Sequence, residues 1–249
     1  GYDNIDIGAA TALNIPVGHT PDVLTRATAD LAFALMLAVS RKMVFLHKQI
    51  LEGKWGHFNP TGNLGIELAG KTLGIFGMGR IGMRLAGLCR DAYQMDILYA
   101  GRSRKPAAEK DLDARFVDFD TLLARSDVVS VHTSLTPGTR KIFDREAFGR
   151  MKPSAIFINT ARGGIHDEPA LKEALATEQI WGAGLDVTDP EPMAAGNPLL
   201  SMENVCVLPH VGSATLEARE AMSVLAARNL IEFFKHGRVP HPVNPEVLS

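Results

Sequence analysis

The sequence has few cysteines and aromatic residues, no long apolar run, and almost no excess of either charge. Cys89 and Cys206 are its two cysteines. Neither belongs to a Cys-x-x-Cys pair, so a disulfide framework is excluded and a reducing, cytoplasmic compartment is expected. The longest apolar run, residues 31–39, is too short to cross a bilayer, and no signal peptide is visible. A net charge of −2 gives no reason to expect nucleic acid or a membrane surface as a partner.

The sequence does contain a regular alternation of short apolar runs with helical patterns. Strands are expected at residues 73–76, 96–99, 128–132, 155–159, 182–187 and 205–208, and helices between them at 81–91, 119–124, 145–151 and 168–176. Longer helices at 28–43 and 215–234 flank this block, and a short strand is expected at 15–18. The alternation predicts an α/β fold with a doubly wound parallel sheet of the Rossmann type.

The first strand of this block leads into a glycine-rich loop. Gly77, Gly79 and Gly82 form a Gly-x-Gly-x-x-Gly pattern between an apolar strand and an amphipathic helix. In that context the three glycines allow a tight turn, a close approach to a pyrophosphate and close packing of helix on strand. The free N–H groups of the helix terminus then face the anion. The pattern therefore predicts a dinucleotide site, and the alternative is a glycine-rich turn without a ligand.

The residues after the second strand bear on which dinucleotide is bound. An NAD enzyme usually has Asp or Glu at this point to hold the ribose 2′-hydroxyl. Here the sequence continues with Arg102, Ser103 and Arg104. Guanidinium and hydroxyl groups suit a 2′-phosphate, so NADP(H) is predicted as the preferred cofactor, with NAD(H) as the other candidate. The alternative is a solvated basic loop.

Polar residues also follow three later strands, where a parallel sheet forms its ligand crevice. Arg162, Glu191 and His210 are the candidates. Arg162 could grip a carboxylate, His210 could donate a proton to a forming alkoxide, and Glu191 could orient the imidazole and favour its protonated form. Asp186 could accept a hydrogen bond from a nicotinamide carboxamide. Each residue could instead be an ordinary loop residue, and Asp189 is a rival carboxylate that spacing does not exclude.

Taken together, these motifs resemble the D-isomer-specific 2-hydroxyacid dehydrogenases, closest to the glyoxylate/hydroxypyruvate reductases and 2-ketogluconate reductases. They occur in the family's order over essentially the whole chain. The resemblance implies that Arg162 binds substrate, Glu191 supports the histidine and His210 is the acid/base. It also implies contacts with the cofactor or substrate for a further set of residues: Asp186 at the nicotinamide, Arg80 and Ile81 at the pyrophosphate, Thr25 and Thr133 along the cofactor, and Gly1 at the substrate carboxylate.

The resemblance further implies two domains. A dinucleotide-binding domain is expected at residues 20–213, and residues 1–19 and 214–249 are interpreted as the remnant of a flavodoxin-like substrate domain. The opening at Gly1 reads as the middle of a fold, so upstream residues are expected, and this chain alone is expected to bind NADPH but turn over poorly. A homodimer is also expected, with residues 53–60 similar to part of a dimer arm.

The implied activity is reduction of a small 2-keto acid (glyoxylate, hydroxypyruvate or 2-ketogluconate) to the D-2-hydroxy acid with NADPH. No metal is expected in the site. The alternative is a dinucleotide-sensing corepressor of the same fold, which binds a partner protein rather than turning over substrate. Oxidation of formate or phosphite is disfavoured by the reductase-like motifs.

Overall fold

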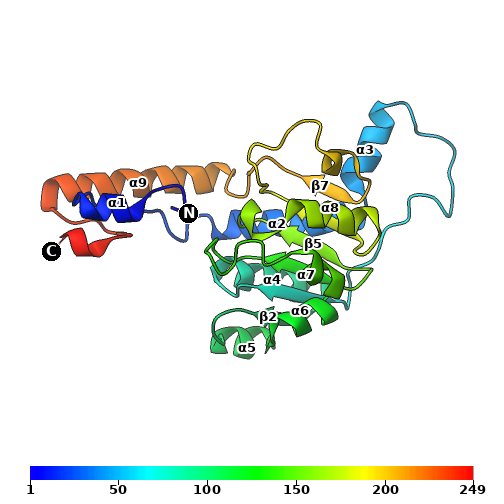
Figure 1. The fold of residues 1–249 in the computed structure, drawn as a ribbon, viewed down its shortest axis with the longest axis horizontal. Helices are drawn as coiled ribbons and strands as arrows, with labels where there is room; N and C mark the ends of the chain where they lie inside the picture. The colour runs from blue at the N-terminus through cyan, green and yellow to red at the C-terminus, as the bar shows by residue number, and fades with distance from the viewer. Residues whose placement is uncertain (249) are drawn as a thin grey trace. The chain divides into compact units, whose positions relative to one another are not determined.

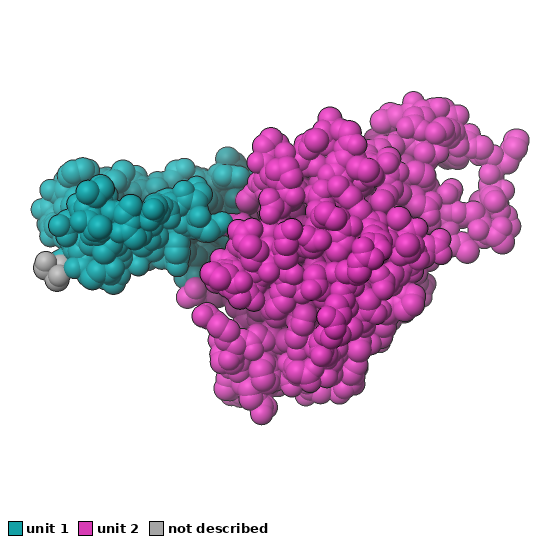
Figure 2. Space-filling view, in the orientation of Figure 1, with its two compact units in different colours: residues 1–27, 213–249 teal, residues 28–212 magenta. Residues whose placement is uncertain are grey.

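The computed structural model describes residues 1–248 of the chain. The chain divides into two compact units, which Figure 2 distinguishes by colour. One unit comprises residues 28–212, and the other comprises residues 1–27 together with the end of the chain from residue 213. None of the helices in the described part of the chain is long and apolar enough to cross a membrane.

The larger unit is built on one parallel sheet of seven strands in the order β3-β2-β1-β4-β5-β6-β7. The strands are β1 (Thr72–Phe76), β2 (Asp96–Ala100), β3 (Arg115–Phe116), β4 (Val128–Val131), β5 (Ile156–Asn159), β6 (Gly182–Leu185) and β7 (Val205–Val207). The order reverses between β1 and β4, so the loops after these strands leave the sheet at its topological switch point. This architecture confirms the predicted Rossmann-type sheet.

Helices cover both faces of this sheet (Figure 1). The helices of the unit are α2 (Thr25–Ser40), whose first turn belongs to the other unit, α3 (Met43–Leu51), α4 (Arg80–Tyr93), α5 (Pro106–Leu112), α6 (Phe119–Arg125), α7 (Arg145–Arg150) and α8 (Glu168–Ala176). Two short 3₁₀ turns, η1 (Gly163–Ile165) and η2 (Pro198–Ser201), lie in the loops after β5 and β6.

Successive side chains of each strand point to opposite faces of the sheet, and this produces two separate apolar cores. Ile75 and Ile158 belong to the core beneath α2, α4 and α5. Phe76 and Phe157, their neighbours in the chain, belong to the core beneath α6, α7 and α8. Both faces of the strands are therefore apolar, which is why the strands read as continuous apolar runs in the sequence.

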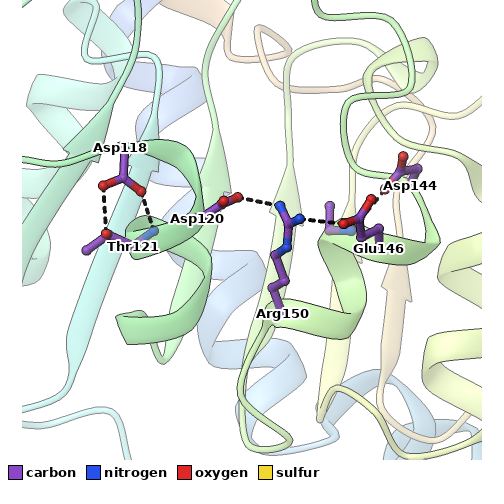
Figure 3. Close-up of polar contacts among 7 residues, drawn as sticks. Asp118, Asp120, Thr121, Asp144, Glu146 and Arg150 are labelled. Carbon is purple, nitrogen blue, oxygen red and sulfur yellow. Dashed lines mark hydrogen bonds and ion pairs between the residues drawn. The ribbon is translucent and has the colours of Figure 1, made fainter.

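The helices over the second core are held by short polar contacts on their outer surface (Figure 3). Asp118 caps α6 by accepting hydrogen bonds from the backbone and side chain of Thr121. Arg150 of α7 pairs with Asp120 of α6 and with Glu146 of its own helix. These exposed ion pairs add little energy individually, but they connect α6 to α7 at the surface.

The smaller unit contains α1 (Ile7–Ala12), α9 (Leu216–His236) and η3 (Pro245–Leu248). Two buried asparagines join its beginning to its end. Asn229 donates to the carbonyl of His19 and accepts from the amide of His241. Asn244 accepts from the Val17 amide at 2.8 Å. The two terminal segments of the chain therefore fold as one piece.

The six predicted strands and the helices between them are confirmed, with no end shifted by more than two residues. The strand expected at 15–18 is wrong, because the segment forms only an isolated antiparallel bridge between Gly18 and Pro242. Prolines on both sides remove the amide donors that a longer ladder needs. Four elements were not predicted, because they are too short or too weakly periodic: helices α1, α3 and α5 and the two-residue strand β3.

Candidate active site

The glycine loop after β1 has the geometry of a pyrophosphate cradle. Gly77 has a φ of +99°, and a Cβ there would lie 2.8 Å from the carbonyl carbon of His132. A Cβ on Gly82 would lie 2.9 Å from a methyl carbon of Ile75. At Gly79, by contrast, a Cβ would meet nothing within 4 Å. Gly77 and Gly82 are thus required by packing, whereas the space at Gly79 is open for a ligand.

Helix α4 begins directly after this open position. Its N-cap residue is Gly79, which provides no side-chain cap, so the first-turn N–H groups around Arg80 and Ile81 are suited to an anion. The Cβ position of Gly77 lies 2.9 Å from the amide nitrogen of Thr133 in the loop after β4. The loops on the two sides of the switch point are therefore in contact where a dinucleotide is expected.

The basic loop after β2 is organised by Tyr99 and Glu109. The Tyr99 hydroxyl accepts from the Lys105 amide at 2.7 Å and donates to Glu109 at 2.6 Å. Glu109 also binds the Arg104 guanidinium through both carboxylate oxygens, at 3.0 and 2.8 Å. Arg102 and Ser103 are exposed. Arg104 therefore already has an anionic partner, which the sequence analysis did not anticipate.

Arg162 lies in the loop after β5, in extended backbone just before η1. The buried side chain of Asn159 supports this loop: its oxygen accepts from the Ala161 amide, and its nitrogen donates to the Arg162 carbonyl, both at 2.9 Å. The same nitrogen lies 3.0 Å from Nδ1 of His166. Neither Asn159 nor His166 was assigned a role from the sequence. The available signal was Asn159, a polar residue at the end of an otherwise apolar strand.

The loops after β5 and β6 pack directly against each other. A Cβ on Gly163 would lie 2.0 Å from the carbonyl oxygen of Thr188, so no other residue fits at that position without displacing one of the loops. This contact places the backbone next to Arg162 against the segment that leads to Glu191. Asp189 pairs at 4.0 Å with Arg140, which lies in the loop after β4.

Glu191 and His210 form a direct pair. Nδ1 of His210 lies 2.5 Å from Oε1 of Glu191. Both side chains remain partly exposed, at 45% for His210 and 42% for Glu191, so the pair faces solvent instead of the core. With Nδ1 engaged, Nε2 is the imidazole atom left to exchange a proton with a ligand. Of the two carboxylates that spacing allowed, Glu191 is the one that pairs with His210.

The buried carboxylate of Asp186, just after β6, fixes the backbone around His210. It accepts from the amides of Val211 and Gly212, both at 2.7 Å, and the Asp186 carbonyl accepts from the His210 amide at 2.9 Å. His210 has a φ of +56°, a left-handed conformation that costs about 1 kcal/mol in a residue with a side chain. Burial raises the pKa of Asp186, and the two amide bonds oppose that shift.

The remaining site residues predicted from the sequence lie in the smaller unit. Gly1 is its first residue, and Thr25 begins α2 within residues 1–27. Their roles toward substrate and cofactor stay predictions. Within residues 1–248, no group of three or more His, Cys, Asp or Glu side chains is placed to hold a metal ion.

Comparison with known families supports the interpretation of the larger unit. A model of the family described as D-isomer specific 2-hydroxyacid dehydrogenase, NAD binding domain, matches residues 33–212. The chain is 48% identical over 253 aligned residues to a glyoxylate reductase of Thermococcus litoralis, an alignment that covers 100% of this chain and 76% of the relative.

Solved structures with the same fold include two informative relatives. The TT0316 protein of Thermus thermophilus matches with a TM-score of 0.91 and 44% identity, over 98% of this chain and 76% of that one. An NADPH-dependent glyoxylate/hydroxypyruvate reductase of Sinorhizobium meliloti, solved in complex with NADP and malonate, matches with a TM-score of 0.87 and 35% identity, over 98% and 75%. These matches confirm the resemblance inferred from the motifs and indicate a nicotinamide dinucleotide as the cofactor.

The open space at Gly79 gives a first prediction. Gly79→Ala should leave the melting temperature unchanged, because a methyl group meets no protein atom there. It should weaken NADPH binding by roughly tenfold, about 1.4 kcal/mol, because the methyl occupies the space left for the pyrophosphate. Fluorescence titration with NADPH measures the affinity, and Gly138→Ala, at another position with open space, is the control. Equal affinity of the two variants for NADPH would contradict the assignment of the Gly79 loop as the pyrophosphate site.

The buried His166 gives a second prediction, on stability against pH. Burial lowers its pKa from 6.5 to about 4, so between these values the unfolded chain binds a proton that the folded protein does not. The stability that neutral His166 contributes is complete above pH 6.5 and is lost as the pH falls toward 4. Between pH 7 and pH 5, the free energy of unfolding should fall by about 2 kcal/mol more in the parent than in His166→Leu. Urea unfolding at both pH values measures this, and parallel losses would refute it.

Proposed function

Because the chain belongs to the D-isomer specific 2-hydroxyacid dehydrogenases, we propose that it reduces a small 2-keto acid to the D-2-hydroxy acid with NADPH. Glyoxylate and hydroxypyruvate are the first candidate substrates, since reductases of these acids are among the relatives, and 2-ketogluconate is the third. The observation that carries the proposal is the Glu191–His210 pair, 2.5 Å apart, at the strand ends of a dinucleotide-binding sheet.

The residues around the glycine loop fit the cofactor. The open position at Gly79 and the uncapped start of α4 suit the pyrophosphate, and Thr133 lies against the same loop at Gly77. When bound, the reduced dinucleotide supplies a hydride to the carbonyl carbon of the substrate. Asp186 lies at the end of β6 in the buried part of the site, where it is proposed to contact the nicotinamide end.

The acid–base residues account for the proton and the substrate charge. The Arg162 guanidinium is a fixed fork of donors that suits the carboxylate and carbonyl oxygens of a 2-keto acid. Its Nη1 donates to the Ala161 carbonyl at 2.6 Å, a contact that substrate binding would exchange or share. Protonated His210 donates the proton on Nε2 to the carbonyl oxygen as that oxygen becomes an alkoxide, and is left neutral. Glu191, bound to Nδ1, orients the ring and stabilises its charged form before the transfer.

The preference for NADPH rests on the loop after β2. Ala100 ends the strand, so no carboxylate is there to hold a ribose 2′-hydroxyl or to repel a 2′-phosphate. Arg102 and Ser103 are exposed and suited to the phosphate. Because Arg104 is paired with Glu109, we assign the larger part of the 2′-phosphate contact to Arg102.

A homodimer in the cytoplasm completes the proposal. The segment around α3 and the following loop exposes large apolar side chains, including Leu51, Trp55 and Phe58 at 74%, 80% and 92%. Such a cluster suits an interface between two copies of the chain. Cys89 and Cys206 are both free and buried, which suits a reducing compartment.

The direct test is a substrate panel. The full-length protein is mixed with NADPH or NADH and with glyoxylate, hydroxypyruvate or 2-ketogluconate, and absorbance at the nicotinamide band is followed. Steady consumption of NADPH with at least one acid supports the reductase. Binding of NADPH without turnover of any of the three would favour the corepressor alternative, which no observation on this chain favours at present.

A third prediction concerns the proton donor. His210→Ala should lower kcat by about 100- to 10,000-fold and leave NADPH binding nearly unchanged, because the general acid is lost while the glycine loop is intact. Glu191→Gln should also lower kcat/KM, because the carboxylate that binds Nδ1 and orients the ring is lost. Steady-state kinetics across the neutral pH range measures both. A wild-type kcat in His210→Ala would remove His210 from its assigned role.

A fourth prediction separates the two arginines of the basic loop. Arg102→Ala should raise the dissociation constant of NADPH by about tenfold or more, as expected for loss of a charge-assisted hydrogen bond worth about 1.5–3 kcal/mol. Arg104→Ala should have a smaller effect, because Glu109 already neutralises that guanidinium. Neither change should alter NADH binding. Fluorescence titration of both variants with both cofactors decides the matter, and a larger effect at Arg104 would reverse our assignment.

A further inference from the structure

A buried polar cluster lies under the loop that carries Arg162. Asn159 is 0% exposed and His166 is 1% exposed, and both lie among apolar neighbours, with the His166 ring edge-on to Phe157 at 5.7 Å. Neither residue belongs to the Glu191–His210 pair or to the glycine loop. Buried polar groups are costly unless they are paired, so their partners indicate what the cluster does.

The orientation of the Asn159 amide is fixed by its two backbone partners. The Ala161 amide can only donate, so it faces the side-chain oxygen, and the Arg162 carbonyl can only accept, so it faces the nitrogen. One hydrogen of that nitrogen is thereby committed to Arg162. The other points to Nδ1 of His166, 3.0 Å away.

His166 must therefore act as an acceptor at Nδ1. An acceptor at Nδ1 means a neutral imidazole that carries its hydrogen on Nε2. Burial favours this neutral form, since it lowers the pKa of His166 to about 4 despite the nearby carboxylates of Glu168, Asp167 and Asp189. Nε2 has no hydrogen-bond partner among the described residues, so the contact with Asn159 is what fixes the ring.

These contacts form one chain from His166 through Asn159 to the main chain of Arg162. We propose that Asn159 and His166 are positioning residues, which hold the Arg162 backbone so that its guanidinium meets the carboxylate of the 2-keto acid. This inference rests on the proposed function. Arg162 has an extended backbone directly before η1, and its carbonyl is bound by Asn159. A shift of that backbone therefore displaces the guanidinium. Displacements of about 1 Å in a substrate-orienting group can cost roughly 100-fold in rate.

The test compares two substitutions of similar size at one position. His166→Asn keeps an acceptor, because the side-chain oxygen of asparagine overlays Nδ1 of histidine, whereas His166→Leu removes it. We expect His166→Leu to raise KM for glyoxylate about tenfold, with kcat lowered less than threefold and the dissociation constant of NADPH unchanged. His166→Asn should return KM to within about threefold of the parent.

A double-mutant comparison separates positioning from a general loss of stability. In an Arg162→Ala background, His166→Leu should have no further effect on kcat/KM, because the group it positions is gone. An unchanged KM in His166→Leu, or an effect that persists in the Arg162→Ala background, overturns the proposal. So does a failure of His166→Asn to restore KM.

A measurement on the parent protein keeps the inference testable if His166→Leu does not fold. Nitrogen NMR of protein labelled with ¹⁵N-histidine should show His166 at neutral pH as the uncharged form with hydrogen on Nε2 and a bare, hydrogen-bonded Nδ1. A proton on Nδ1 would overturn the proposed contact. Absence of turnover with every keto acid in the panel would instead refute the proposed function, and the NMR result would still decide the arrangement of Asn159 and His166.

Discussion

The candidate site depends most on the hydrogen bonds that the buried Asp186 accepts from the backbone around His210. The carboxylate binds two consecutive amides after His210, and the Asp186 carbonyl binds the amide of His210. Three hydrogen bonds from consecutive backbone amides to Asp186, two of them to its carboxylate, thus hold a histidine in a left-handed conformation that it would not adopt readily alone. With the backbone fixed, the imidazole has its Nδ1 against Glu191 and its Nε2 directed away from that carboxylate. The amides stabilise the buried Asp186 carboxylate, and the carboxylate fixes the backbone that orients His210, the proposed acid.

The parallel sheet explains how residues far apart in sequence reach the same edge. Arg162, Glu191 and His210 follow β5, β6 and β7, which are adjacent in the sheet. The backbone contact at Gly163 joins the first two loops, and the Asp186 hydrogen bonds join the second and third. The proposed cofactor loops follow β1 and β2, on the other side of the switch point, and β4, which borders the switch point on the near side. In the proposed function, the loops after β1, β2 and β4 hold most of the dinucleotide, and the loops after β5, β6 and β7 supply the acid–base and substrate-binding groups.

Much of this arrangement could be predicted from the sequence. The strands were visible because both faces of each are buried, and Gly77, Gly79 and Gly82 were visible because their spacing is tied to a turn between strand and helix. The pairing of Glu191, rather than Asp189, with His210 could be predicted from the family resemblance but not from spacing alone, because both carboxylates follow the same strand. The Arg104–Glu109 pair and the Asn159–His166 contact depend on side-chain placement across loops, on which local pattern carries no information. Short elements such as α5 and β3 have too few residues to show a period.

The central claim is that the Asp186 carboxylate fixes the backbone that carries His210. Hydrogen exchange at the amides of Val211 and Gly212, in the parent and in Asp186→Asn, tests it most directly, because an asparagine side chain can accept from one of these amides but not from both. The account predicts slow exchange at both amides in the parent, and faster exchange at one or both in the variant, while the amides of β1 stay protected in each. Exchange at the rate of an open loop in the parent, or equal rates in the two proteins, would contradict it.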